Sequence, residues 1–106
     1  TDAADAYTRL GLADNVIGQA MNIGTGIETD IATLARLIIK IMGAKIEPNF
    51  TGKINPGEAG RLVCNPSKGM KILNWKPTVS LEDGLKQTVD YYLKNTHLYK
   101  FLDTVV

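Results

Sequence analysis

Cysteine, histidine and long apolar runs are scarce in this chain of 106 residues, which has one cysteine and one histidine. The single cysteine, Cys64, excludes an internal disulfide, agrees with a reducing compartment and reads as a small buried residue. The lone His97 leaves no zinc pattern and little basis for nucleophilic catalysis, so we predict neither a metal site nor a catalytic residue. No run reaches the roughly 18 apolar residues of a membrane span, and no secretory signal is visible. We therefore expect a soluble cytoplasmic protein.

An excess of charge of one sign is also absent. Twelve basic side chains face eleven acidic ones, which leaves a formal net charge of +1. This balance gives no electrostatic reason to expect nucleic acid or an anionic membrane as partner. Hydrophobic residues make up 44% and charged residues 22% of the chain, which is typical of a folded protein. The length predicts one small domain over residues 1–106.

Four segments have the pattern of helices. Residues 2–12 are rich in alanine, and the helix predicted over residues 30–42 is capped by Thr29 or Asp30 and ended by Gly43. A short helix is predicted to start at Asn65 and Pro66, with asparagine as its N-cap and proline as its first helical residue. A last helix is predicted to begin at Ser80, with Asp83 completing a capping box.

Three segments between these helices read as short strands. They are residues 19–23, residues 45–50, which Pro48 interrupts, and residues 61–64. Strands separated by helices predict an α/β fold, here an α+β-like small domain with short strands and about four helices. The glycine-threonine-glycine sequence at residues 24–26 does not complete a dinucleotide fingerprint, since Thr29 stands where a third glycine is needed, so we interpret it as a turn rather than a phosphate cradle.

The most promising candidate for a binding site is the loop of residues 55–61, called the candidate loop below. It joins an acid, a base and flexible backbone in one irregular stretch, and ligand contacts tend to lie on such loops. The Glu58 carboxylate can accept hydrogen bonds from the two hydroxyls of a ribose, and the Arg61 guanidinium suits a diphosphate. The alternative is a solvated loop whose charges have no ligand.

Several short motifs occur in an order that resembles a known family. Residues 22–26 read Asn-Ile-Gly-Thr-Gly, residues 56–58 read Pro-Gly-Glu, residues 73–77 read Leu-Asn-Trp-Lys-Pro, and residues 80–85 read Ser-Leu-Glu-Asp-Gly-Leu. The chain resembles the C-terminal part of extended short-chain dehydrogenase/reductase enzymes, the NAD-dependent epimerases and dehydratases of nucleotide sugars. The resemblance covers nearly the entire chain. It implies the C-terminal, substrate-side lobe of a Rossmann-type enzyme.

The resemblance also implies which parts of such an enzyme are absent from this sequence. Members of the family bind NAD in an N-terminal Rossmann domain, which also carries a catalytic tyrosine and a lysine four positions later. Here the residues four positions after a tyrosine are Gly11, Asn95, Thr96 and Asp103. The resemblance therefore implies a nucleotide-sugar-binding chain with no catalytic residue and no cofactor of its own, inactive alone, with NAD in the parent enzyme.

Position by position, the resemblance assigns three residues of the candidate loop to the substrate. Glu58 matches the family's acid that meets the ribose, and Arg61 matches a basic position on the diphosphate. Asn55 falls where many members place an arginine, so it departs from the pattern. Asn74 stands where glycine is common, and asparagine is the residue that best tolerates the left-handed backbone after glycine.

Two hypotheses about function follow from the sequence. The first is a fragment of a nucleotide-sugar epimerase or dehydratase, whose partners are a nucleoside-diphosphate sugar and the N-terminal Rossmann domain; residues 2–7 already read as a helix in progress. The alternative is a free-standing, non-catalytic binding or interaction domain derived from that family. An enzyme fragment should expose the apolar surface that it packs on the rest of the enzyme, which distinguishes the two hypotheses.

Overall fold

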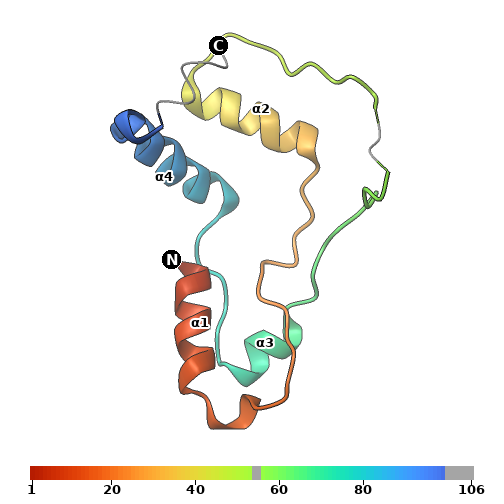
Figure 1. Cartoon of the computed structure of the whole chain (residues 1–106), viewed down its shortest axis with the longest axis vertical. Coiled ribbons are helices and arrows are strands. Elements are labelled where there is room, and N and C mark those ends of the chain that lie inside the picture. Colours follow the sequence, from red (N-terminus) through yellow and green to blue (C-terminus); the bar gives the residue numbers. More distant parts are fainter. Residues whose placement is uncertain (54–55, 100–106) are drawn as a thin grey trace. The chain divides into compact units, whose positions relative to one another are not determined.

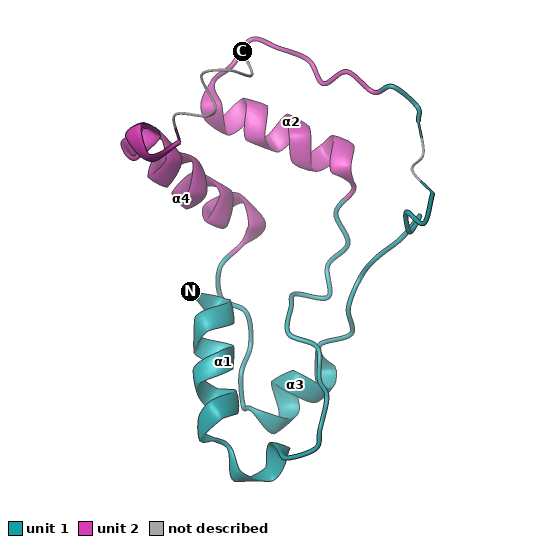
Figure 2. Cartoon of the chain, viewed as in Figure 1, with its two compact units in different colours: residues 1–29, 51–79 teal, residues 30–50, 80–106 magenta. Residues whose placement is uncertain are grey.

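A computed structural model describes residues 1–53 and 56–99, and its regular structure is helical. The α-helices are α1 (Asp2–Leu12), α2 (Ile31–Met42), α3 (Ser67–Ile72) and α4 (Leu81–Lys94), joined by long irregular segments (Figure 1). Short 3-10 helices cover Asp14–Val16 and Thr96–Leu98. The chain forms two compact units (Figure 2). Unit 1 comprises residues 1–29 and 51–79, and unit 2 comprises residues 30–50 and 80–106.

The predicted α/β fold is wrong, because residues 1–53 and 56–99 contain no strand. The segments 19–23, 45–50 and 61–64 have no regular secondary structure, and none of them pairs with a neighbour in a sheet. A strand needs a second chain segment to satisfy its backbone N–H and C=O groups. A strand-like sequence pattern indicates extended, buried backbone, but it does not show whether a second segment is available for pairing.

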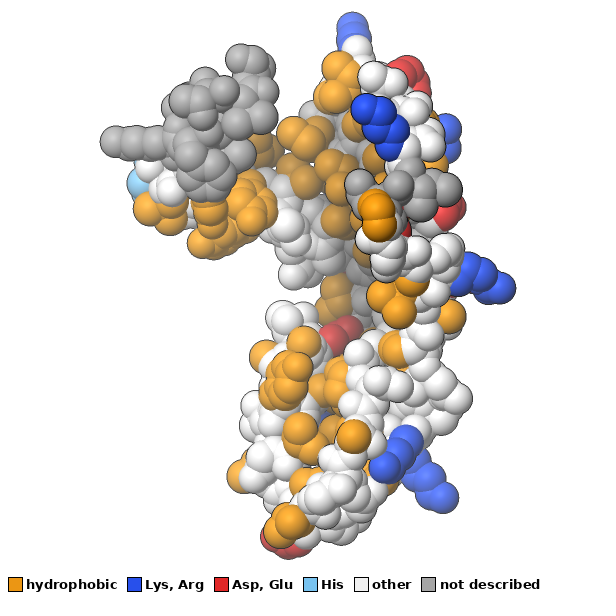
Figure 3. Space-filling view, turned by 45° about the vertical axis from the view of Figure 1, so that its right-hand side comes forward, with side chains coloured by type: hydrophobic (Ala, Val, Ile, Leu, Met, Phe, Trp, Pro, Cys, Tyr) orange, Lys and Arg blue, Asp and Glu red, His pale blue; other side chains and the backbone are white. Residues whose placement is uncertain are grey.

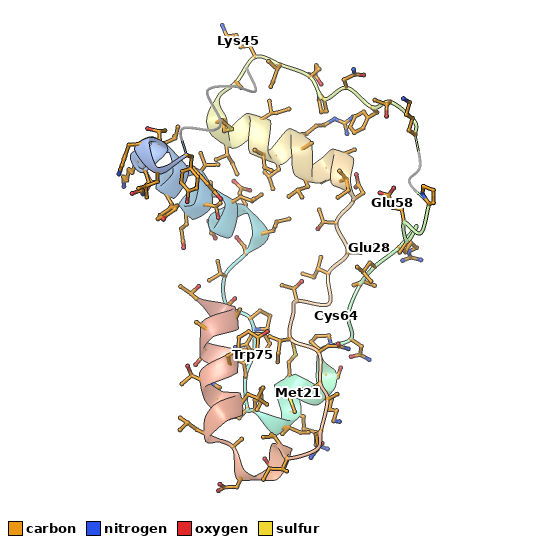
Figure 4. The ribbon with its side chains drawn as sticks, viewed as in Figure 1. Met21, Glu28, Lys45, Glu58, Cys64 and Trp75 are labelled. Carbon is orange, nitrogen blue, oxygen red and sulfur yellow. The ribbon has the colours of Figure 1, made fainter. Side chains whose placement is uncertain are left out.

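Unit 1 is built around one tryptophan. Trp75 is 4% exposed and is buried together with Ala6 of α1 and Leu73. Partly buried apolar residues from α1, α3 and residues 13–23 surround them: Leu10, Ala13, Val16, Met21, Ile23, Met70 and Ile72. Figure 4 shows Trp75 in the space between α1 and α3. The segment 19–23, predicted as a strand, thus contributes side chains to this core instead of pairing in a sheet.

Polar contacts fasten α1 to residues on both sides of Trp75 in the sequence. The Asp2 carboxylate accepts hydrogen bonds from the backbone N–H groups of Thr78 and Val79, each at 2.9 Å, and from the Thr78 hydroxyl at 2.8 Å. At the other end of the helix, Arg9 Nη1 donates to the carbonyl of Asn74 at 2.7 Å. Asn74 has a φ of 45°, so the expectation of a left-handed backbone at this residue is confirmed.

Removing the charge of Asp2 should weaken unit 1 in a pH-dependent way. Hydrogen bonds from Val79 and Thr78 lower the pKa of the Asp2 carboxyl below its ordinary value. Stability from such a group is present above the unfolded-state pKa, about 3.9, and is lost as pH falls through the lower folded-state pKa. We expect Asp2→Asn to be less stable than the wild type near pH 7, with the difference shrinking in strong acid. Urea denaturation at several pH values tests this, and a difference independent of pH would contradict it.

Unit 2 consists of two capped helices that pack against each other, α2 and α4. Asp30 caps α2 by accepting a hydrogen bond from the Thr33 N–H at 2.8 Å, and Gly43 ends it with a φ of 65°. Ser80 caps α4 by accepting from the Asp83 N–H at 3.1 Å. The predicted helix boundaries at these residues are therefore confirmed. The caps satisfy backbone groups that a helix end otherwise leaves without partners.

Many large apolar side chains of the described residues are exposed to solvent, whereas the hydrophobic core consists of three residues. Ile17 is 91% exposed, Leu62 90% and Leu12 79%. The space-filling view shows hydrophobic side chains scattered over the visible surface (Figure 3). Monomeric proteins leave single apolar residues exposed, but here fifteen large apolar side chains of the described residues are exposed and three hydrophobic residues are buried.

Candidate functional site

The candidate loop lies in unit 1, and the structure describes its residues 56–61. Residues 56 and 57 form a turn, and Gly57 has a φ of 85°, a left-handed value that suits glycine. Glu58 and Arg61 are both exposed, so both side chains are accessible to a ligand. Asn55, the third predicted site residue, lies outside the described residues. The structure therefore places two of the three predicted residues on one exposed loop.

The Arg61 side chain makes a two-point ion pair with Glu28. Arg61 Nε donates to one carboxylate oxygen at 2.8 Å and Nη2 donates to the other at 2.5 Å. The Arg61 side chain is 78% exposed and that of Glu28 is 40% exposed. Figure 4 shows Glu28 and Glu58, which lie on different segments of unit 1. Glu28 was not a predicted site residue, since 33 positions separate it from Arg61 and no spacing rule joins them.

Close packing of two chain segments explains how Glu28 reaches Arg61. A methyl group added to Gly24 would lie 2.6 Å from Cys64 Sγ, and one added to Gly26 would lie 3.2 Å from the Pro66 ring. The segments 24–28 and 61–66 thus lie alongside each other, with residue 24 at 64 and residue 28 at 61. Glycine at both positions leaves room for the Cys64 side chain and the Pro66 ring.

The same packing bears on the glycines at residues 24–26. Because Cys64 and Pro66 fill the space beside Gly24 and Gly26, these residues do not form an open cradle for phosphate. Gly26 has a φ of 72°, as a turn requires, which agrees with the interpretation of this segment as a turn.

Electrostatics keep both members of the ion pair charged. Hydrogen bonding from Arg61 lowers the pKa of Glu28, and the Glu28 carboxylate raises the pKa of Arg61. At neutral pH the pair therefore combines one negative and one positive charge in contact. A guanidinium that donates two parallel hydrogen bonds can hold a carboxylate or a phosphate in this way.

A cavity of about 430 Å³ lies in unit 2, and no residue of the candidate loop lines it. It is formed by the last turns of α2 and the segment 44–48, and Arg36, Lys40 and Lys45 contribute positive charge. The Arg36 guanidinium lies 5.8 Å from the centre of the Phe50 ring, so it already has an aromatic partner. The carbonyl end of a helix disfavours anions, which weakens the case for a phosphate in this cavity.

The next features concern metal binding, the single histidine and cysteine, and membrane-spanning helices. No group of three or more His, Cys, Asp or Glu side chains in residues 1–53 and 56–99 is arranged to hold a metal ion. His97 is exposed, as expected for a surface residue, and Cys64 is half-buried rather than fully buried. In the part of the chain that the structure describes, no helix has the length and apolar character needed to cross a membrane.

Comparison with curated proteins finds relatives over most of the chain. It is 40% identical over 100 residues to GDP-L-fucose synthase 1 of Arabidopsis thaliana, and this match covers 89% of the chain. It is 33% identical over 91 residues to UDP-glucose 4-epimerase of Mycolicibacterium smegmatis, covering 86% of the chain, and 34% identical over 104 residues to dTDP-D-glucose 4,6-dehydratase of Mus musculus, covering 93%. These relatives are nucleotide-sugar enzymes. The similarity supports the family that the sequence motifs indicated.

The chain spans less than a third of the length of these relatives. The matches cover 28% of the first two proteins and 29% of the third. No protein-family model matches the chain, and no solved structure matches it significantly. Each of the three names contains a nucleoside diphosphate, but the base differs in all three and the sugar is fucose in one and glucose in two, so the similarity alone does not select a substrate for this chain.

Proposed function

We propose that this chain is the substrate-side part of an NAD-dependent nucleotide-sugar epimerase or dehydratase and contributes binding of the nucleoside diphosphate. The observation that carries the proposal is the placement of Glu58 and Arg61 on one exposed loop of a chain whose relatives act on nucleotide sugars. Glu58 would accept hydrogen bonds from the ribose hydroxyls, and Arg61 would bind the diphosphate. Both residues position the substrate, and neither takes part in the chemical step.

In this proposal the rest of the enzyme binds NAD and carries out the reaction, so the chain alone turns over no substrate. The exposed apolar residues of the chain favour a partner surface of further protein, such as the Rossmann domain of the parent enzyme. This exposure is also the observation that ranks an enzyme part above the alternative of a free-standing binding domain. A self-sufficient domain would bury a larger share of these side chains.

A ligand-observed NMR titration with UDP-, dTDP- and GDP-sugars tests the proposed binding. We expect saturable binding of sugars on one of the bases, and we expect Arg61→Ala and Glu58→Ala each to weaken it about tenfold, because each removes hydrogen bonds that involve a charged group. Arg36→Ala, which removes an exposed arginine of unit 2, serves as the control and should leave binding unchanged. Absence of binding to a chain that is folded by circular dichroism would contradict the proposal.

A further inference from the structure

In the free chain, the Arg61 guanidinium that we assign to the diphosphate is already paired with Glu28. Arg61 Nε and Nη2 hold the two oxygens of Glu28, at 2.8 Å and 2.5 Å. A phosphate group presents two oxygens to a guanidinium in the same forked arrangement. We propose that Glu28 is an internal counter-ion of Arg61 that a nucleoside diphosphate displaces on binding. This inference rests on the proposed function of Arg61.

The ion pair is of a kind that can open at low cost. Both side chains are well exposed, and exposed ion pairs are weak because water screens and solvates the separated charges. The described residues offer the Glu28 carboxylate no hydrogen bond other than those from Arg61. Asp30, two positions later, contrasts with it, since its carboxylate is fixed by Thr33 as the cap of α2. Glu28 can therefore turn away without breaking a helix cap.

Glu28 and an anionic ligand compete for Arg61, so Glu28 should affect the affinity of the chain for nucleotides. The Glu28–Arg61 pair is neutral as a whole, so it attracts an anion less than an unpaired guanidinium does. A diphosphate carries more negative charge than one carboxylate and can replace it on Arg61, whereas an uncharged nucleoside cannot. Glu28 would thus lower the affinity for every nucleotide and favour ligands that carry the full diphosphate.

Substitution of Glu28 tests the inference in the full 106-residue chain. UDP, GDP, dTDP and the nucleoside uridine are titrated into the wild type, Glu28→Gln, Arg61→Ala and the double variant. We expect Glu28→Gln to bind the preferred nucleoside diphosphate about two- to fivefold more tightly, as the loss of a weak competing ion pair predicts. The gain should vanish in the Arg61→Ala background and be absent for uridine. Glu47→Gln removes an exposed glutamate of unit 2 and should change nothing.

The Arg61 Nε–H resonance supplies a second measurement. It should differ between the free wild type and free Glu28→Gln, and it should reach the same position in both once the nucleotide is bound. If the wild type binds nucleotide and Glu28→Gln binds it no more tightly, the counter-ion inference is wrong while the proposed function stands. If no nucleotide binds to any folded variant, the proposed function fails and the inference fails with it.

Discussion

Replacing Trp75 with alanine should unfold unit 1. The Trp75 side chain is 4% exposed and is one of three buried hydrophobic residues in the described part of the chain, so no second core exists there to compensate for its loss. Truncating a buried tryptophan costs about 3–5 kcal/mol, a large part of the stability of a small domain. We expect loss of the cooperative transition that belongs to unit 1 when the variant is followed by circular dichroism in urea.

Two further variants test whether the loss of stability comes from the burial of Trp75 or from the loss of any aromatic ring. Tyr7 lies on α1 and is 67% exposed, so Tyr7→Ala should change the free energy of unfolding by less than about 0.5 kcal/mol. Trp75→Phe should retain much of the stability, because it keeps an aromatic ring and removes the indole Nε1–H, which is buried without a hydrogen-bond partner among the described residues. A Trp75→Ala variant as stable as Tyr7→Ala would contradict the proposed core.

Replacing two helical glycines with alanine should change the free energy of unfolding in opposite directions. A methyl group on Gly69, in α3, would lie 2.7 Å from the Asn22 carbonyl oxygen and 3.0 Å from Ile23 Cδ1. Since the first of these atoms belongs to the backbone, α3 must move away from the segment that contains Asn22. We expect Gly69→Ala to cost about 1–3 kcal/mol, the range seen when well-packed sites are overfilled.

Gly11, in α1, is the matched control. A methyl group there would meet no other atom within 4 Å, apart from the chain neighbours and the helix backbone. Alanine favours a helix over glycine by up to about 1 kcal/mol, so Gly11→Ala should raise the free energy of unfolding. Thermal denaturation of the two variants and the wild type measures both changes in stability. Equal effects of the same sign would show that the packing of α3 against residues 22–23 is not as described.

The helices could be predicted from the sequence because their signals are local. Asp30 and Gly43 at the ends of α2, and Ser80 and Asp83 at the start of α4, lie within one turn of the backbone groups that they cap. The short helix was predicted with Asn65 as N-cap and Pro66 as its first residue, but the N-cap is Pro66, and Asn65 accepts a hydrogen bond from the Ser67 N–H at 3.0 Å from one position earlier. The helix itself begins at Ser67.

The strands and the ion pair could not be predicted in the same way. A strand depends on backbone hydrogen bonds to a partner segment, and the segments at 19–23 and 61–64 are not assigned to any strand in the described chain, so predicting strands there was wrong. Glu28 meets Arg61 only because Gly24 and Gly26 let two distant segments pack closely. The sequence around Glu28 contains no pattern from which its ion-pair partner could be predicted.

Location of the nucleotide on the chain is the most direct test of the central claim. Two-dimensional ¹H–¹⁵N NMR of the 106-residue chain is recorded with increasing amounts of the nucleoside diphosphate that binds. The account predicts that the amide resonances of residues 57–61 and of Glu28 shift together and saturate at one dissociation constant. Shifts centred on Arg36, Lys40 and Lys45 at the cavity of unit 2 would contradict it and would move the binding site away from the candidate loop.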